Sequence, residues 1–294
     1  MLCGCNLRLM GVFLPVGGIL ALCAPAANAD PQAQPVPQQA STESSDAEEE
    51  PSYNGQDFTR PQRSFETRLR YQTSGTTSRT DKETLYLRAT TKIELGSGWK
   101  LGLFGQMSVL DKTVTSSAPP TTTTESGVGD STFQGALIYT IDQHWAYGFG
   151  ARLVDPTAQD SLGSGKWQIM PGFGVRYSFL EFGPDTYFVP VIRYAMSFAG
   201  NPSARTISEP QIAPTLNIGL RDRWFVTFYP SNDIRINYGQ PVSGQTGRLF
   251  LPFDAAIGRK FTNDLVISLE ASVPIIKDYP VYNFKTEFKI AVNF

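Results

Sequence analysis

The sequence predicts an all-β protein, a single antiparallel up-and-down transmembrane β-barrel of twelve strands behind an export signal and an acidic tail. Long runs alternate strictly between apolar and polar residues, as strands do when their two faces meet different solvents. These runs are about 10 residues or longer, the length that a tilted strand needs to cross a membrane. No apolar run of about 18 residues follows the signal, which excludes helical spans.

Residues 1–29 have the features of a secretory signal peptide. Arg8 supplies the positive charge, an apolar stretch follows, and Ala27-Asn28-Ala29 has the small-x-small pattern of a cleavage site. Lipidation of Cys23 is the alternative, but Leu22 stands where that motif has a small residue. All three cysteines belong to this signal, so the mature chain contains no cysteine nucleophile and no cysteine metal site.

Residues 30–63 are predicted to be a disordered periplasmic tail, rich in Pro, Gln and Glu and poor in large apolar residues. Residues 30–59 hold seven acidic side chains and no basic ones, whereas residues 60–294 hold 24 basic and 20 acidic ones. A tail of charge −7 is thus joined to a barrel of charge +4. This contrast suggests the hypothesis that the tail gates the lumen in a salt-sensitive way.

Residues 64–294 are predicted to form the barrel. The expected strands cover residues 64–73, 82–95, 99–109, 128–140, 145–155, 166–179, 186–198, 208–220, 224–238, 248–259, 265–276 and 282–294. The run 224–238 contains Pro230 and could form a hairpin, but its apolar residues keep one parity throughout, which favours one strand. The count is then twelve, and bacterial barrels have even strand numbers.

The connections alternate between short turns and longer loops, as expected for periplasmic and outer ends. The longer loops are expected at residues 74–81, 110–127, 156–165, 199–207, 239–247 and 277–281. Of these, 110–127 is interpreted as a flexible surface loop, because it contains Pro119-Pro120 and a run of threonines.

Aromatic residues support this orientation. Trp99, Trp145 and Trp224 each open a strand directly after a short turn, as an aromatic girdle at the periplasmic interface requires. The chain ends in Phe294 on an alternating strand, which resembles the signature read by the barrel-assembly machinery.

The polar faces of the strands predict a mildly basic lumen. The candidate lining residues are Arg68, Arg88, Arg152, Arg176, Arg193, Glu94, Asp130, Glu270 and Glu287. Twelve strands lie between the small barrels that side chains fill and the large ones that leave a channel. A narrow pore and an interior filled by salt bridges are therefore both open interpretations.

One group of motifs is similar to those of a known family. It consists of Gly127-Val128-Gly129-Asp130, Pro156-Thr157 and Leu162-Gly163-Ser164-Gly165-Lys166-Trp167. These motifs resemble those of the outer-membrane transporter family linked to the phenol meta-cleavage pathway. The resemblance covers residues 127–180 and, more loosely, the strands up to the C-terminus. It implies passage of small, aromatic or hydrophobic compounds.

The remaining function classes are weighed against the channel. A lipid-modifying enzyme would need a histidine beside a serine nucleophile. His144 is the only histidine and lies in a predicted turn without a serine nearby, which disfavours this class. Gly163-Ser164-Gly165-Lys166 lacks the spacing of a phosphate-binding loop. We expect no catalytic residues, cofactor, metal site or nucleic-acid partner. The main alternative is a closed structural or adhesive barrel. The expected location is the outer membrane, with lipid or lipopolysaccharide, the assembly machinery and a small solute as partners.

Overall fold

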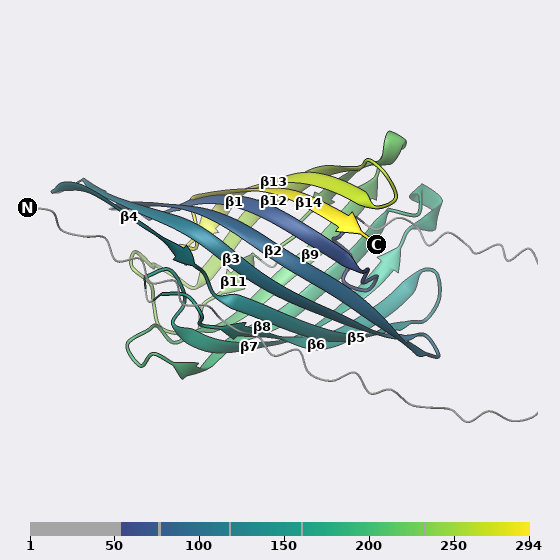
Figure 1. Cartoon of the computed structure of the whole chain (residues 1–294), viewed down its shortest axis with the longest axis horizontal. Coiled ribbons are helices and arrows are strands. Elements are labelled where there is room, and N and C mark those ends of the chain that lie inside the picture. The colour runs from purple at the N-terminus through teal and green to yellow at the C-terminus, as the bar shows by residue number, and fades with distance from the viewer. Residues whose placement is uncertain (1–53, 76–77, 118, 160, 232) are drawn as a thin grey trace, which may run out of the picture. The chain divides into compact units, whose positions relative to one another are not determined.

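The structure, a computed structural model, describes residues 54–75, 78–117, 119–159, 161–231 and 233–294 (Figure 1). The expected signal peptide and residues 30–53 of the expected tail lie outside the described residues. The elements are β1 Ser64–Ser74, β2 Ser78–Gly96, β3 Trp99–Ser117, β4 Pro120–Val128, β5 Ser131–Thr140, β6 Trp145–Asp155, β7 Lys166–Ser178, the 3-10 helix η1 Leu180–Phe182, β8 Tyr187–Gly200, β9 Ser208–Gly219, the 3-10 helix η2 Arg221–Arg223, β10 Trp224–Phe228, β11 Ile234–Ile236, β12 Leu249–Lys260, β13 Leu265–Lys277 and β14 Phe284–Asn293.

These strands form one closed antiparallel barrel. The last strand returns to the first, because β1 pairs with β14 from Ser64 opposite Asn293 to Thr73 opposite Phe284. The fourteen strands fill twelve positions, since β4 and β5 pair with the two halves of β3, and β10 and β11 both lie between β9 and β12. The twelve-stranded barrel is therefore confirmed, and residues 224–238 keep to one position of it.

The barrel strand made of β10 and β11 is interrupted between Phe228 and Ile234. Tyr229 adopts a φ of +52°, a conformation that costs energy for a residue with a side chain. Pro230, Ser231 and Asp233 of this interruption line the cavity inside the barrel. The break thus brings an acidic side chain to the lumen.

The barrel wall has apolar side chains on its outer face and polar ones on its inner face, the opposite of a water-soluble protein. Phe65, Leu69 and Phe133 are about half exposed on the outside, whereas Lys285 and Lys289 are almost fully buried inside. Period-two alternation produces this result, because successive residues of a strand point to opposite faces. An apolar outer belt around a polar interior is the arrangement of a membrane barrel. No helix among the described residues is long and apolar enough to span a membrane.

The prediction of a flexible loop at residues 110–127 is wrong. Except near the tip, these residues belong to β3 and β4, which pair from Val109 opposite Val128 to Ser117 opposite Pro120. Together with β2, which begins at Ser78 within the expected loop 74–81, they extend the wall beyond the other strands (Figure 1). Polar β-branched residues pair well across strands, and because β4 is exposed on both faces it carries no apolar alternation.

Candidate functional site

The candidate site is a cavity of about 380 Å³ inside the barrel. Inward-facing residues of most of the barrel strands line it, together with residues from the segment before β1. The lining includes six arginines but only two carboxylates, and these residues are Arg68, Arg70, Arg88, Arg152, Arg193, Arg235, Glu66 and Asp233. The predicted basic lumen thus has its positive charge concentrated in one place.

Residues 54–61, here named the inner segment, lie inside the barrel. Asn54, Asp57 and Thr59 are at most 2% exposed. The Tyr187 hydroxyl donates to the Asn54 side-chain oxygen at 2.8 Å, and the Lys289 ammonium donates to the Asn54 carbonyl at 3.2 Å. The composition of these residues predicts a disordered tail, but here they are held by the wall and narrow the lumen.

Asp57 is the electrostatic anchor of the inner segment. One of its oxygens lies 3.7 Å from the Arg176 guanidinium and 3.5 Å from that of Arg60. The other accepts the Thr59 backbone N–H and hydroxyl at 2.8 and 2.6 Å. Arg176 is itself only 3% exposed, so each charge compensates the burial of the other.

Glycines of the wall make room for this segment. A Cβ atom at Gly148 or Gly174 would lie within 3 Å of the Phe58 ring, and one at Gly102 would lie 3.1 Å from Pro61. These glycines take inward positions of β6, β7 and β3, where other strands carry long polar side chains. Glycines at inward positions of neighbouring strands are the sequence signal that could have indicated another segment of chain inside the lumen.

The nine predicted lining residues occupy several environments. Arg68, Arg88, Arg152 and Arg193 line the cavity. Arg176 instead binds the inner segment. Glu94 lies near the turn between β2 and β3, where Lys92 and Lys100 each approach it to 3.6 Å, away from the cavity.

Glu287 belongs to a charged network on one wall. Its carboxylate forms ion pairs with Arg68 at 3.3 Å and Arg70 at 2.6 Å, while Glu66 pairs with Arg68 from the other side. Arg235 is likewise paired, with Glu209 at 3.6 Å and Asp233 at 3.0 Å. These arginines are neutralised by carboxylates, as the interpretation of a salt-bridged interior requires.

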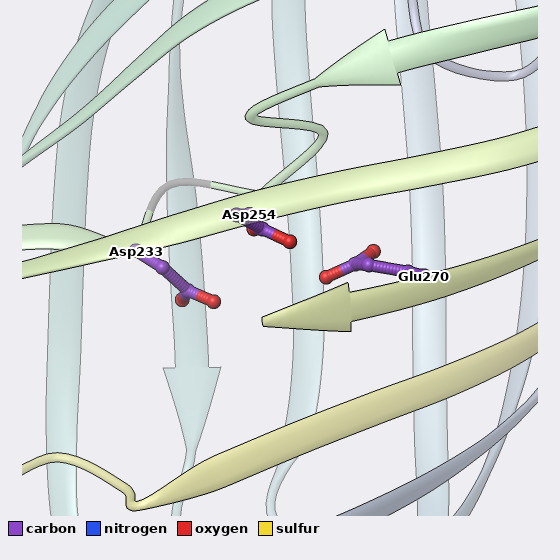
Figure 2. Close-up of side chains that lie close together, drawn as sticks. All are labelled: Asp233, Asp254 and Glu270. Carbon is purple, nitrogen blue, oxygen red and sulfur yellow. The ribbon is translucent and has the colours of Figure 1, made fainter. Parts of the chain in front are cut away.

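Glu270 belongs to a buried trio with Asp233 and Asp254, whose carboxylates point toward one another (Figure 2). One oxygen of each lies within 4.8 Å of the others. The Lys285 ammonium contacts all three, at 3.4 Å from Asp254 and closer to the other two. A cation of the protein's own thus occupies the position that a metal ion would take.

Asp130 fixes an outer loop. Its carboxylate accepts the Ser164 backbone N–H at 2.8 Å and the Ser164 hydroxyl at 2.7 Å. A Cβ atom at Gly163 would lie 2.3 Å from an Asp130 oxygen, so glycine is required there. The motif residues therefore act as a structural clip between the start of β5 and the loop before β7.

The three tryptophans lie on the outer surface at the end of the short turns. Trp99 packs 4.9 Å from the Tyr139 ring and Trp145 packs 4.8 Å from the Tyr177 ring, between ring centroids. The Arg259 guanidinium stands 5.6 Å over Trp224. Their role as an interfacial girdle, in which amphipathic rings sit at headgroup level, stays a prediction.

The turn before β6 is closed by Asp142. The backbone N–H groups of Trp145 and His144 donate to its carboxylate at 2.6 and 2.8 Å, and these bonds lower the pKa of Asp142 below its ordinary value. The His144 ring lies 2.9 Å from the Ser178 carbonyl oxygen. His144 is thus engaged in holding the turn against β7.

The neutral partners of the arginines are not apparent from the sequence. Gln106, Gln134 and Gln211 each accept a hydrogen bond from an arginine on the adjacent strand. Their positions on the polar faces could be read from parity, but the pairing depends on strand register.

Comparison with known proteins gives a family and a fold. Residues 53–273 match the family described as "Putative MetA-pathway of phenol degradation". The COG4313 outer membrane channel from Pseudomonas putida F1 has a TM-score of 0.58 at 16% identity, covering 80% of this chain and 97% of that one. The KdgM porin has a TM-score of 0.42 at 10% identity, covering 79% and 99%, and the NanC porin 0.47 at 12%, covering 78% and 98%. None of the curated proteins matches.

Proposed function

Because the chain belongs to this phenol-degradation family, as the resemblance of its motifs led us to expect, we propose that it is an outer-membrane channel for the passive passage of small solutes, aromatic or hydrophobic compounds among them. The observation that carries this proposal is the arginine-rich cavity of about 380 Å³ inside a closed barrel with an apolar outer surface. A barrel that needed only stability would pair every arginine around this space with a carboxylate, whereas Arg152 and Arg193 are held by glutamines instead.

We propose no catalytic role. His144 is bound to a backbone carbonyl in a turn, and a lipid-modifying enzyme would need a histidine poised beside a nucleophile. In keeping with the channel, residues 1–29 are proposed to be removed on export and Phe294 to be read by the assembly machinery, with lipid or lipopolysaccharide around the belt. N-terminal sequencing of the protein from outer membranes should give a chain that begins at Asp30.

Planar-bilayer recording of the refolded full mature chain tests the channel. We expect discrete current steps in KCl and, in proteoliposomes, osmotic swelling with small solutes that declines as solute size approaches that of the cavity. Refolding is checked by the gel shift between unheated and heated samples. A correctly folded protein that produces neither steps nor swelling would contradict the proposal.

A closed structural barrel is the second candidate, and the inner segment is the observation that favours it. Asn54, Asp57 and Thr59 are buried in the lumen and hydrogen-bonded there. If these residues stay in place permanently, conductance is absent from the native protein and from variants that weaken their contacts. Conductance that rises when the contacts are weakened favours the channel instead.

A further inference from the structure

Three cross-strand pairs in the lumen share one composition, an arginine held by a glutamine. The side-chain oxygen of Gln106 accepts from Arg88 at 3.0 and 2.7 Å. That of Gln134 accepts from Arg152 at 3.0 Å, and that of Gln211 accepts from Arg193 at 2.6 Å. The partners stand directly opposite each other in the strand register. A glutamine fixes a guanidinium group without neutralising it.

Two of these arginines keep their positive charge. Arg88 has Glu66 at 4.0 Å. In the part of the chain that the structure describes, neither Arg152 nor Arg193 has a carboxylate at ion-pair distance. Both line the same cavity and are half-buried. Removing a charge from water costs free energy unless an opposite charge lies beside it. Arg152 and Arg193 are therefore suited to bind an anion.

Each guanidinium group has N–H donors to spare. An arginine offers five, and its glutamine occupies only a part of them. Their planar fork matches the two oxygens of a carboxylate, and such charge-assisted bonds are stronger than neutral ones. The chemistry of Arg152 and Arg193 therefore points to a carboxylate.

The rest of the cavity is suited to an aromatic ring. The Phe104 ring lies 4.4 Å from the Arg88 guanidinium and 5.2 Å from that of Arg152, which orients both arginines. Phe58 and Met170 add apolar side chains to the lining. A volume of about 380 Å³ is at the lower end of small-molecule sites, so it suits a compound of one ring.

We propose that the lumen contains a binding site for small aromatic monocarboxylates. Arg152 and Arg193 bind the carboxylate, and Phe58 and Met170 pack against the ring. The inference rests on the proposed channel function, since a channel brings external solutes to the site, and it names the class of solute that the channel selects.

Isothermal titration calorimetry of the full mature chain in detergent micelles tests the site, with benzoate, benzyl alcohol and acetate as probes. We expect benzoate to bind about tenfold or more tightly than either of the others, because it alone uses both halves of the site. Arg152→Gln and Arg193→Gln should each weaken benzoate about tenfold and leave benzyl alcohol unchanged. Arg79→Gln, which removes an exposed arginine on β2 outside the cavity, should change neither.

Gln134→Glu is the more demanding variant, because it retains Arg152 and supplies it with a carboxylate of nearly the same shape. If Arg152 served only the fold, this variant would be as stable as the parent and would bind benzoate equally. We expect it to fold, as judged by the gel shift, and to lose benzoate affinity to the same extent as Arg152→Gln.

Equal affinities for benzoate and benzyl alcohol, or benzoate binding that survives both Arg152→Gln and Gln134→Glu, would overturn the inference. Current steps without benzoate binding would refute the site and leave the channel standing. Benzoate binding with the expected variant effects but without any conductance would support the site and contradict the proposed channel.

Discussion

Replacing Asp57 by asparagine should release the inner segment and raise conductance. Asp57→Asn keeps an oxygen that can accept from Thr59 but removes the charge that faces Arg176 at 3.7 Å and Arg60 at 3.5 Å. Breaking a buried pair from one side costs about 3–5 kcal/mol, since it leaves the other charge uncompensated. At about 1.4 kcal/mol per tenfold, the population with the segment displaced should rise about a hundredfold or more.

Single-channel recording in KCl measures this change, with the gel shift as the control for folding. Asp81→Asn removes the same charge from an exposed pair with Arg79 and should leave conductance as it is. Deleting residues 31–57 removes the anchor together with the acidic tail and should raise conductance most at low salt, because screening is then weakest. If a folded Asp57→Asn protein has the parent's conductance and open time, the proposed holding role of this ion pair is refuted.

Three further variants test other contacts. Gly174→Ala places a Cβ atom 2.6 Å from the Phe58 ring, so current steps should become larger, and unchanged steps would contradict the packing described. Gly163→Ala places one 2.3 Å from an Asp130 oxygen; the clipped loop should become cleavable by external protease, and continued resistance would count against the clip. Lys285→Met leaves three carboxylates without their cation and should lower the free energy of unfolding by about 3–5 kcal/mol in urea titrations, with partial recovery in Ca²⁺; an unaltered midpoint and slope would argue against the pairing.

The barrel itself could be predicted from the sequence because its wall has lipid on one side and a polar interior on the other. Because of that contrast, apolar and polar residues alternate along each spanning strand. This alternation predicted the number of barrel strands and the inward orientation of Arg68, Arg88, Arg152 and Arg193. Pro230 interrupts the run 224–238, but the apolar residues keep the same parity on both sides of it. The predicted number of barrel strands was therefore correct.

Apolar–polar alternation does not predict the structure of segments whose two faces meet the same surroundings. Both faces of β4 are exposed and carry no apolar alternation, so its threonines resemble a loop in sequence although they pair in register with β3. The inner segment carries no period, because wall glycines and Arg176, more than 40 residues away in the chain, decide its place. The glutamine partners of Arg152 and Arg193 follow from strand register, which one sequence does not reveal.

The most direct test of a selective channel is the reversal potential of the open protein under a KCl gradient. Because Arg152 and Arg193 keep their charge in the lumen, we expect preference for chloride in the parent protein and a reduced preference in Arg152→Gln and Arg193→Gln. A folded parent protein that prefers potassium, or a chloride preference untouched by both variants, would contradict it.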